Sequence, residues 1–241
     1  MSERAFTSKS TLIAILLYLL AILLFDLMGL LIKVLGQRYA PIELMAYRNL
    51  FGMIPAVIAL FVLSGWRGKW RELGIRQWKL AFGRGVVVII AQLSFYIALI
   101  RMDFATATTI SYSNALFMVA FAVPLLGEKV GLTRWAAVII GAIGVVMVMG
   151  LGEDAYQAIA LLPLMAGLCY ALVGITARLF DDVVPSPLLN LYSASASAIT
   201  AVVFTLFSVG FSSITTGADL AQIVAMGCFG GAAVLTLVIS M

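Results

Sequence analysis

Two charged residues, Asp26 and Arg48, interrupt long apolar stretches of the sequence. A charge inside hydrocarbon is costly, so such residues face a helix-bundle interior or an aqueous cavity. Counted along α-helices, Asp26 lies about 13 Å and Arg48 about 10 Å from the same end of their two segments, so the side chains are able to meet. They form either a structural pair that joins two helices or a functional pair. In the functional pair, Arg48 is the counter-charge of an anionic group and Asp26 is its partner or a proton-coupling carboxylate.

Three further candidates lie in the stretch 80–100. Gln92 and Tyr96 are four residues apart and therefore share a helix face. An amide and an aromatic ring on one face are able to orient and stack on a planar or zwitterionic solute. Arg84 lies about one turn from the end of the stretch, where it either extends its charge to the interface or contributes to binding.

The stretch 104–126 carries most of the remaining polar candidates. Thr108, Ser111, Tyr112 and Ala115 follow the spacing of one helical face. Either the hydroxyls bond to the preceding turn and to neighbouring helices, or the face lines a cavity. Asn114, which has four hydrogen-bonding positions to satisfy in mid-segment, is a further cavity candidate.

Several kinds of chemistry are excluded by residue types. The chain has no histidine, and its two cysteines, Cys169 and Cys228, lie separately in apolar stretches. We therefore expect no metal site, no cofactor, no disulfide and no catalytic centre. No glycine-rich phosphate loop is present, so the chain has no ATPase of its own. The basic residues responsible for the net charge of +4 gather in short loops, which argues against nucleic-acid binding.

The elements that must position these residues are membrane helices. Of 241 residues, 63% are hydrophobic and only 11% are charged, and the mean hydropathy is +1.13. Such a chain lacks the polar residues for a water-facing surface. Apolar runs long enough to span a bilayer predict eight helices in an all-α multi-pass membrane protein. The expected spans are 11–35, 42–64, 80–100, 104–126, 133–151, 156–179, 186–209 and 219–241.

Lysine and arginine set the expected orientation, because they accumulate in cytoplasmic loops. With the N-terminus inside, the inner segments hold ten of these residues and the outer segments only Lys33, Arg38 and Arg101. We therefore expect a cytoplasmic-membrane protein with a cytoplasmic N-terminus.

The sequence also suggests an internal repeat. A shift of 145 residues aligns Gly29 with Gly174, Lys33 with Arg178 and Tyr47 with Tyr192. A five-helix unit would enter the membrane from opposite sides in its two copies, as in many secondary carriers. The expected units are 1–151 with five helices and 156–241 with only three, so the second copy is two helices short.

Several motifs then resemble a known family. Residues 105–150 contain Ala107-Thr108, Ser113 to Phe117, Leu126-Gly127-Glu128-Lys129 and the glycine-rich stretch 135–144. This stretch resembles the EamA-type repeat of the drug/metabolite transporter superfamily, as do Glu43, Arg48 and Arg84-Gly85. The resemblance implies a ten-helix carrier of small organic solutes, built from two inverted repeats around a central cavity. Ala115 stands where the family often has proline, so the resemblance does not imply a kink in 104–126.

The leading hypothesis is a secondary transporter of a small metabolite: an amino acid derivative, a nucleoside-like compound or a vitamin. It would work by alternating access, coupled to protons or to exchange. The alternative is a non-transporting membrane subunit or an inactive, truncated carrier. Gly227 and Gly231 form a close-packing motif, interpreted as a contact within the chain, while a homodimer remains open.

Overall fold

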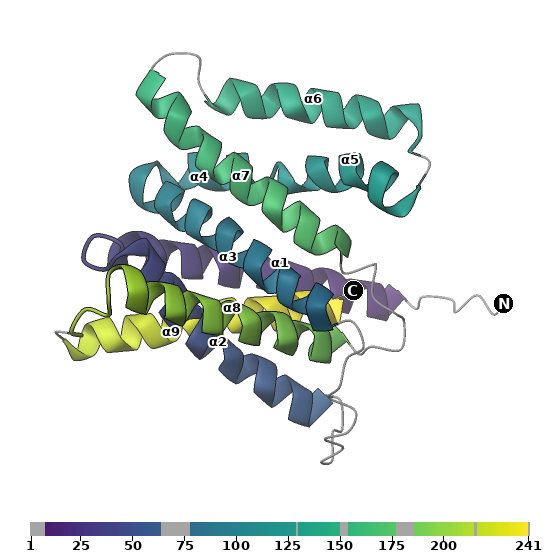
Figure 1. Cartoon of the computed structure of the whole chain (residues 1–241). Helices are drawn as coiled ribbons and strands as arrows, with labels where there is room; N and C mark the ends of the chain where they lie inside the picture. Colours follow the sequence, from purple (N-terminus) through teal and green to yellow (C-terminus); the bar gives the residue numbers. More distant parts are fainter. Residues whose placement is uncertain are drawn as a thin grey trace.

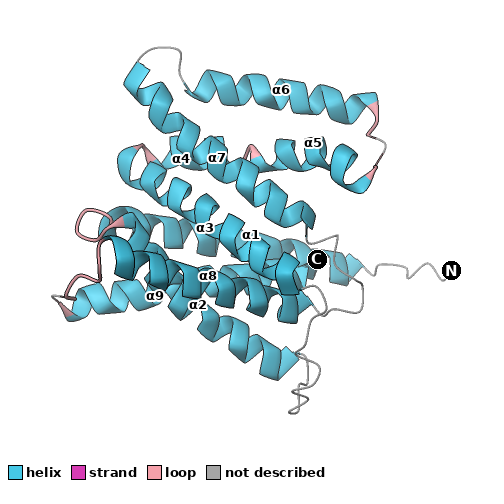
Figure 2. Cartoon of the chain, in the orientation of Figure 1, coloured by secondary structure: helices cyan, strands magenta, loops and turns pink. Residues whose placement is uncertain are grey.

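The computed structural model describes residues 8–63, 78–128, 130–149, 154–176, 186–214 and 216–240, and within them it contains nine α-helices and no strand (Figure 2). The helices are α1 (Ser8–Leu35), α2 (Pro41–Leu63), α3 (Trp78–Arg101), α4 (Phe104–Ser111), α5 (Asn114–Leu126), α6 (Leu132–Met149), α7 (Asp154–Thr176), α8 (Ser186–Ser208) and α9 (Gly217–Ser240). The all-α prediction is confirmed, and the ends agree with the expected spans to within a few residues. Residues 65–77 of the expected basic loop 65–79, and Arg178, lie outside the described residues.

Seven segments of the described chain are long and apolar enough to cross a membrane. The pair α4 and α5 counts as one of them, Phe104–Leu126. Many large apolar side chains on α1 and α6 are exposed, and α6 buries none of its residues. Apolar surfaces of this size belong in lipid, so the chain is a multi-pass membrane protein. The one remaining expected span, 42–64, corresponds to α2, which is of similar length.

The helices form a bundle in which α9 packs between α1 and α2, while α3 packs against α7 and α8 (Figure 1). Helices α2 and α8 also touch. Helix α6 lies outermost and packs against α4, α5 and α7. The fully buried residues Ile32, Leu44, Leu99 and Ile223 belong to the central core.

The stretch 104–126 corrects the expectation of an unbroken helix, because α4 ends at Ser111 and α5 begins at Asn114. The Ser111 hydroxyl donates to the Thr108 carbonyl (2.9 Å), and the Thr108 hydroxyl donates to the Phe104 carbonyl (2.8 Å). The backbone N–H of Ser113 bonds three residues back, to Ile110. Side-chain hydroxyls that compete for backbone carbonyls bend helices without a proline.

Two helix crossings are close because small residues lie at them. A Cβ on Gly231 of α9 would lie 2.9 Å from Gly52 Cα of α2, and one on Gly85 of α3 would lie 2.6 Å from Ala196 Cβ of α8. The expected contact of the Gly227–Gly231 motif within the chain is thus confirmed. The Ser197 hydroxyl of α8 also donates to the Gly85 carbonyl (3.1 Å).

These two crossings are related by the shift of 145 residues. Gly230 lies against Arg48 in the first crossing, and Gly85 lies against Ser193 in the second. Adding 145 to Arg48 gives Ser193, and subtracting 145 from Gly230 gives Gly85. The correspondence pairs α2 and α9 with α8 and α3, respectively.

The C-terminal ends of α5 and α3 are each stabilised by a specific residue. Gly127 ends α5 at φ +67°, a left-handed conformation that glycine adopts without strain, and this accounts for the glycine of the Leu-Gly-Glu-Lys motif. Lys33, in the last turn of α1, donates from Nζ to the carbonyls of Leu99 (3.2 Å) and Met102 (2.6 Å). The ammonium thus caps the carbonyl end of α3.

Candidate functional site

Arg48 lies where α2 crosses α9, with its guanidinium held by two acceptors. Nη1 donates to Asn49 Oδ1 (3.0 Å) and Nη2 donates to the Gly230 carbonyl (3.2 Å). A Cβ on residue 230 would lie 2.7 Å from both Arg48 Nε and Met28 Sδ. Only glycine at this position leaves room for the guanidinium where it lies. The Nε atom is buried and has no hydrogen-bond partner.

An amide pair joins α2 to α3 beside the arginine. Asn49 Nδ2 donates to Gln92 Oε1 (2.8 Å), and Gln92 Nε2 donates to Asn49 Oδ1 (3.2 Å). Both side chains are almost completely buried. A reciprocal pair of this kind fixes the rotamers of both residues, because either amide left unpaired would lose a buried hydrogen bond.

Tyr96 lies one turn beyond Gln92 on α3. Its side chain is 1% exposed, and its hydroxyl has no hydrogen-bond partner. It lies within electrostatic range of Arg48, as does Tyr170 of α7. The structure therefore brings together three of the candidate residues, Arg48, Gln92 and Tyr96, and adds Asn49. We refer to Arg48, Asn49, Gln92 and Tyr96 as the Arg48 cluster.

The Arg48 cluster has the chemistry of an anion-recognition site. The Arg48 Nε–H is a charged donor, the Tyr96 hydroxyl is a neutral one, and both are buried without acceptors. A carboxylate is the complementary group, since it offers two acceptor oxygens and forms charge-assisted bonds with a guanidinium. No group of three or more His, Cys, Asp or Glu side chains is placed to hold a metal ion within the described residues.

The expected meeting of Asp26 with Arg48 is wrong. No ion pair joins them, and the residue of α1 that faces Arg48 across Gly230 is Met28. Residues two apart on an α-helix point about 200° away from each other, so Asp26 faces elsewhere. It is half-buried and lies within electrostatic range of Tyr112, at the break between α4 and α5.

The predicted polar face of 104–126 is divided by the helix break. The hydroxyls of Thr108 and Ser111 donate to backbone carbonyls of the preceding turn of their own helix. This arrangement is the structural alternative that the sequence left open for them. The Tyr112 side chain is 57% exposed. Asn114 opens α5 and is half-buried. These residues lie apart from the hydrogen-bond network of the Arg48 cluster, and their role in binding stays a prediction.

Arg84 is buried near the start of α3, beside the crossing with α8. Asn49 was missed by sequence reasoning, although a buried amide next to Arg48 in an apolar run was a usable signal.

Comparisons with known proteins place the chain in a family. The model of the EamA-like transporter family matches residues 12–150. An uncharacterized transporter of Helicobacter pylori is 28% identical over 162 residues, which is 66% of this chain and 53% of that protein. An S-adenosylmethionine uptake transporter of Rickettsia felis is 26% identical over 198 residues, which is 82% of this chain and 65% of that protein.

The chain thus spans 53% and 65% of the length of these two relatives. A protein of known crystal structure has the same fold, with a TM-score of 0.65 and 20% identity, and the match covers 95% of this chain and 79% of that one. Because the family match covers more than half of the chain and agrees with the expected resemblance, the chain belongs to the EamA-like transporter family.

Proposed function

We propose that the protein is a secondary transporter of a small amphoteric metabolite, whose anionic group binds to Arg48. The observation that carries this proposal is the pair of buried, unpartnered donors in the Arg48 cluster. Buried donors without acceptors are unfavourable in a protein whose only role is structural, and a ligand that supplies acceptors removes that cost. Intramembrane charges are also typical of transport pathways.

The proposed substrate class is an amino acid derivative that carries a nucleoside or another flat ring, with S-adenosylmethionine as the first compound to test. The names of the Rickettsia relatives support this choice. The chemistry of the site supports it as well. The Arg48 guanidinium suits the α-carboxylate, and the rings of the buried Tyr96 and the half-buried Tyr170 are able to pack against a base.

The proposed mechanism is alternating access, coupled to protons or to exchange. The related crossings of α2 with α9 and of α8 with α3 support two repeats of opposite orientation, with boundaries near 1–151 and 156–241. The repeats differ at the site, because Ser193 occupies the position related to Arg48. In this proposal the repeat 1–151 supplies the charge of Arg48, and the repeat 156–241 supplies the backbone at Gly230 that packs closely against it. The proposed orientation has the N-terminus in the cytoplasm and the protein in the inner membrane.

The second candidate is a membrane subunit without transport activity of its own, or one that acts as a homodimer. A flux assay separates the two candidates.

The test is uptake of radiolabelled S-adenosylmethionine by proteoliposomes that contain the purified chain. We expect uptake above that of protein-free liposomes, and its loss in Arg48→Gln. The matched control is Arg101→Gln, which removes an exposed guanidinium from the end of α3 and should transport normally. Equal uptake by Arg48→Gln and Arg101→Gln would contradict the assignment of the site, and no uptake by the intact chain would favour the second candidate.

A further inference from the structure

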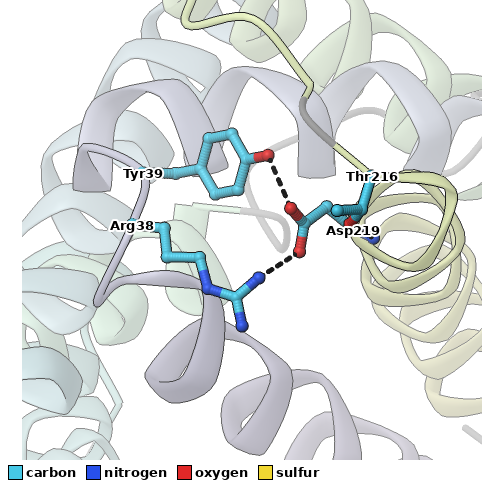
Figure 3. A network of polar contacts seen from close by, with 4 residues as sticks. All are labelled: Arg38, Tyr39, Thr216 and Asp219. Carbon is cyan, nitrogen blue, oxygen red and sulfur yellow. Dashed lines mark hydrogen bonds and ion pairs between the residues drawn. The ribbon is translucent and has the colours of Figure 1, made fainter.

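Asp219 anchors the first turn of α9 to the turn between α1 and α2 (Figure 3). Its carboxylate accepts hydrogen bonds from Arg38 Nη1 (2.6 Å) and from the Tyr39 hydroxyl (3.3 Å). Its backbone N–H donates to Thr216 Oγ1 (3.1 Å), which caps the helix. The Asp219 side chain is 1% exposed, whereas that of Arg38 is 60% exposed. The pair therefore lies at the edge of the bundle, with the carboxylate on the inner side.

Glu43 makes a second connection at the same end. Its fully buried carboxylate accepts hydrogen bonds from the Ser212 backbone N–H (2.8 Å) and from the Ser212 hydroxyl (3.0 Å). Next to it, the Thr205 hydroxyl donates to the Ile42 carbonyl (3.2 Å). The end of α8 and the loop that follows it are thus held to the start of α2.

These contacts lie on the N-terminal side of the Arg48 cluster along α2. Glu43 precedes Arg48 by five residues, or about 7.5 Å along α2. Glu43, Ala46 and Asn49 are spaced by three, so they follow one stripe of the helix from the closed end to the amide pair. On the proposed transport path, a solute that reaches Arg48 from this end passes between α2 and the segments 205–214 and 216–219.

Carboxylates suit a contact that must open and close. A buried carboxylate is stable only while its hydrogen bonds are made, but an exposed one is stabilised by water. The contacts of Glu43 and Asp219 therefore exchange protein donors for water when the segments part. An apolar seal of the same area would lose its stabilisation on opening.

We propose that Glu43 and Asp219 are the residues that hold the external gate of this protein shut, with the loop 209–214 and the start of α9 as its moving part. The inference rests on the proposed transport function and orientation. In this assignment the two carboxylates act through the segments that they hold, and they do not bind the substrate.

The experiment measures access to a single cysteine, Ala46→Cys, in a chain whose Cys169 and Cys228 are replaced by alanine. Ala46 is small, fully buried and lies one turn below Glu43. A membrane-impermeant methanethiosulfonate is added to intact cells, and in a parallel arm to inside-out vesicles. The labelling rate of the cysteine is the readout, and it requires no substrate.

We expect slow labelling from outside in the parent chain. Asp219→Asn and Glu43→Gln keep the volume of each side chain but weaken its charge-assisted hydrogen bonds. The outside rate should then rise roughly 10- to 150-fold, the factor that corresponds to losing such a bond. Ser212→Ala should give a smaller rise because the backbone N–H remains. Labelling from the inner face should not rise.

The matched control is Asp103→Asn, an exposed carboxylate at the same end that makes no capping hydrogen bond. Its labelling rate should equal that of the parent. If a buried-site variant folds poorly, Arg38→Gln tests the same pair through an exposed side chain, and its outside rate should also rise.

Normal protein abundance with an unchanged outside rate in both Arg38→Gln and Asp219→Asn would overturn the proposal, as would an equal rise on both faces. Faster outside labelling without uptake of any amphoteric solute would keep the gate and contradict the proposed transport. Unchanged labelling with normal uptake would contradict the gate and leave the proposed transport standing.

Discussion

Replacing Gly230 by alanine tests the Arg48 cluster without removing any of its polar groups. The new Cβ would lie 2.7 Å from Arg48 Nε and from Met28 Sδ, whereas ordinary contacts of a Cβ begin near 3.4 Å. The difference, 3.4 − 2.7, requires a shift of about 0.7 Å. Both atoms belong to flexible side chains, so the side chains should move and the backbone should stay.

The expected effect is on binding. A displaced guanidinium loses its 3.2 Å hydrogen bond to the Gly230 carbonyl and its alignment with an incoming carboxylate. Hydrogen bonds to charged groups contribute about 1.5–3 kcal/mol, which corresponds to roughly 10- to 150-fold in apparent affinity. We therefore expect the KM for S-adenosylmethionine in proteoliposomes to rise by a factor in this range, with little loss of thermal stability.

Two other glycines provide the comparison. Alanine at Gly231 would meet the backbone of Gly52, with its Cβ 2.9 Å from the Cα, so α2 and α9 must separate. Overpacking of this kind costs about 1–3 kcal/mol and should lower the melting temperature more than Gly230→Ala does. Alanine at Gly144 meets nothing within 4 Å and should change neither quantity. Gly230→Ala with an unchanged KM, or with the same stability loss as Gly231→Ala, would refute the reasoning.

Three further predictions follow from single contacts. Arg48→Ala should abolish uptake while the protein keeps its normal abundance in the membrane. Asp26→Asn should do the same if Asp26 is a coupling carboxylate. Abundance is measured by quantitative blotting, and its loss together with uptake would indicate a structural role instead. Asn49→Leu and Gln92→Leu should each lower the free energy of unfolding by about 1–3 kcal/mol, because the partner amide is left without its hydrogen bond. In a thermal-unfolding cycle, the double variant should lose less than the sum of the two single losses. Additive losses would show that the amides are uncoupled. Gly127→Ala should cost about 1–2 kcal/mol because alanine is strained at φ +67°, and a melting temperature equal to that of the parent would contradict the turn geometry.

Sequence reasoning predicted the membrane helices because hydropathy is a local property. It also placed Gln92 and Tyr96 on one face, since helical spacing is fixed by geometry. The grouping of Arg48 with these two residues was not predicted, because the sequence analysis paired Arg48 with Asp26. The in-chain contact of Gly227 and Gly231 was predicted for a similar reason, because small residues at this spacing permit close approach.

Other features depend on information that a single sequence does not carry. Depth along a helix does not determine its rotation, so the predicted contact of Asp26 with Arg48 was wrong. The helix break before Asn114 was missed because no proline lies at the break and the polar residues there were interpreted as packing or as a cavity face. The partners of Glu43 and Asp219 lie 169 and 181 residues away along the chain, and local patterns do not reveal contacts of such separation.

The central claim, that Arg48 binds the carboxylate of a transported metabolite, is tested most directly by competition. Uptake of labelled S-adenosylmethionine is measured in proteoliposomes with unlabelled S-adenosylmethionine or its decarboxylated analogue as competitor. With the parent chain, the complete compound should compete at least tenfold better, because a charge-assisted bond of about 1.4 kcal/mol or more depends on the carboxylate. Arg48→Lys, which retains the charge but loses the planar donor geometry, should keep measurable uptake with a reduced preference. Equal competition by the two compounds in the parent chain would contradict the claim.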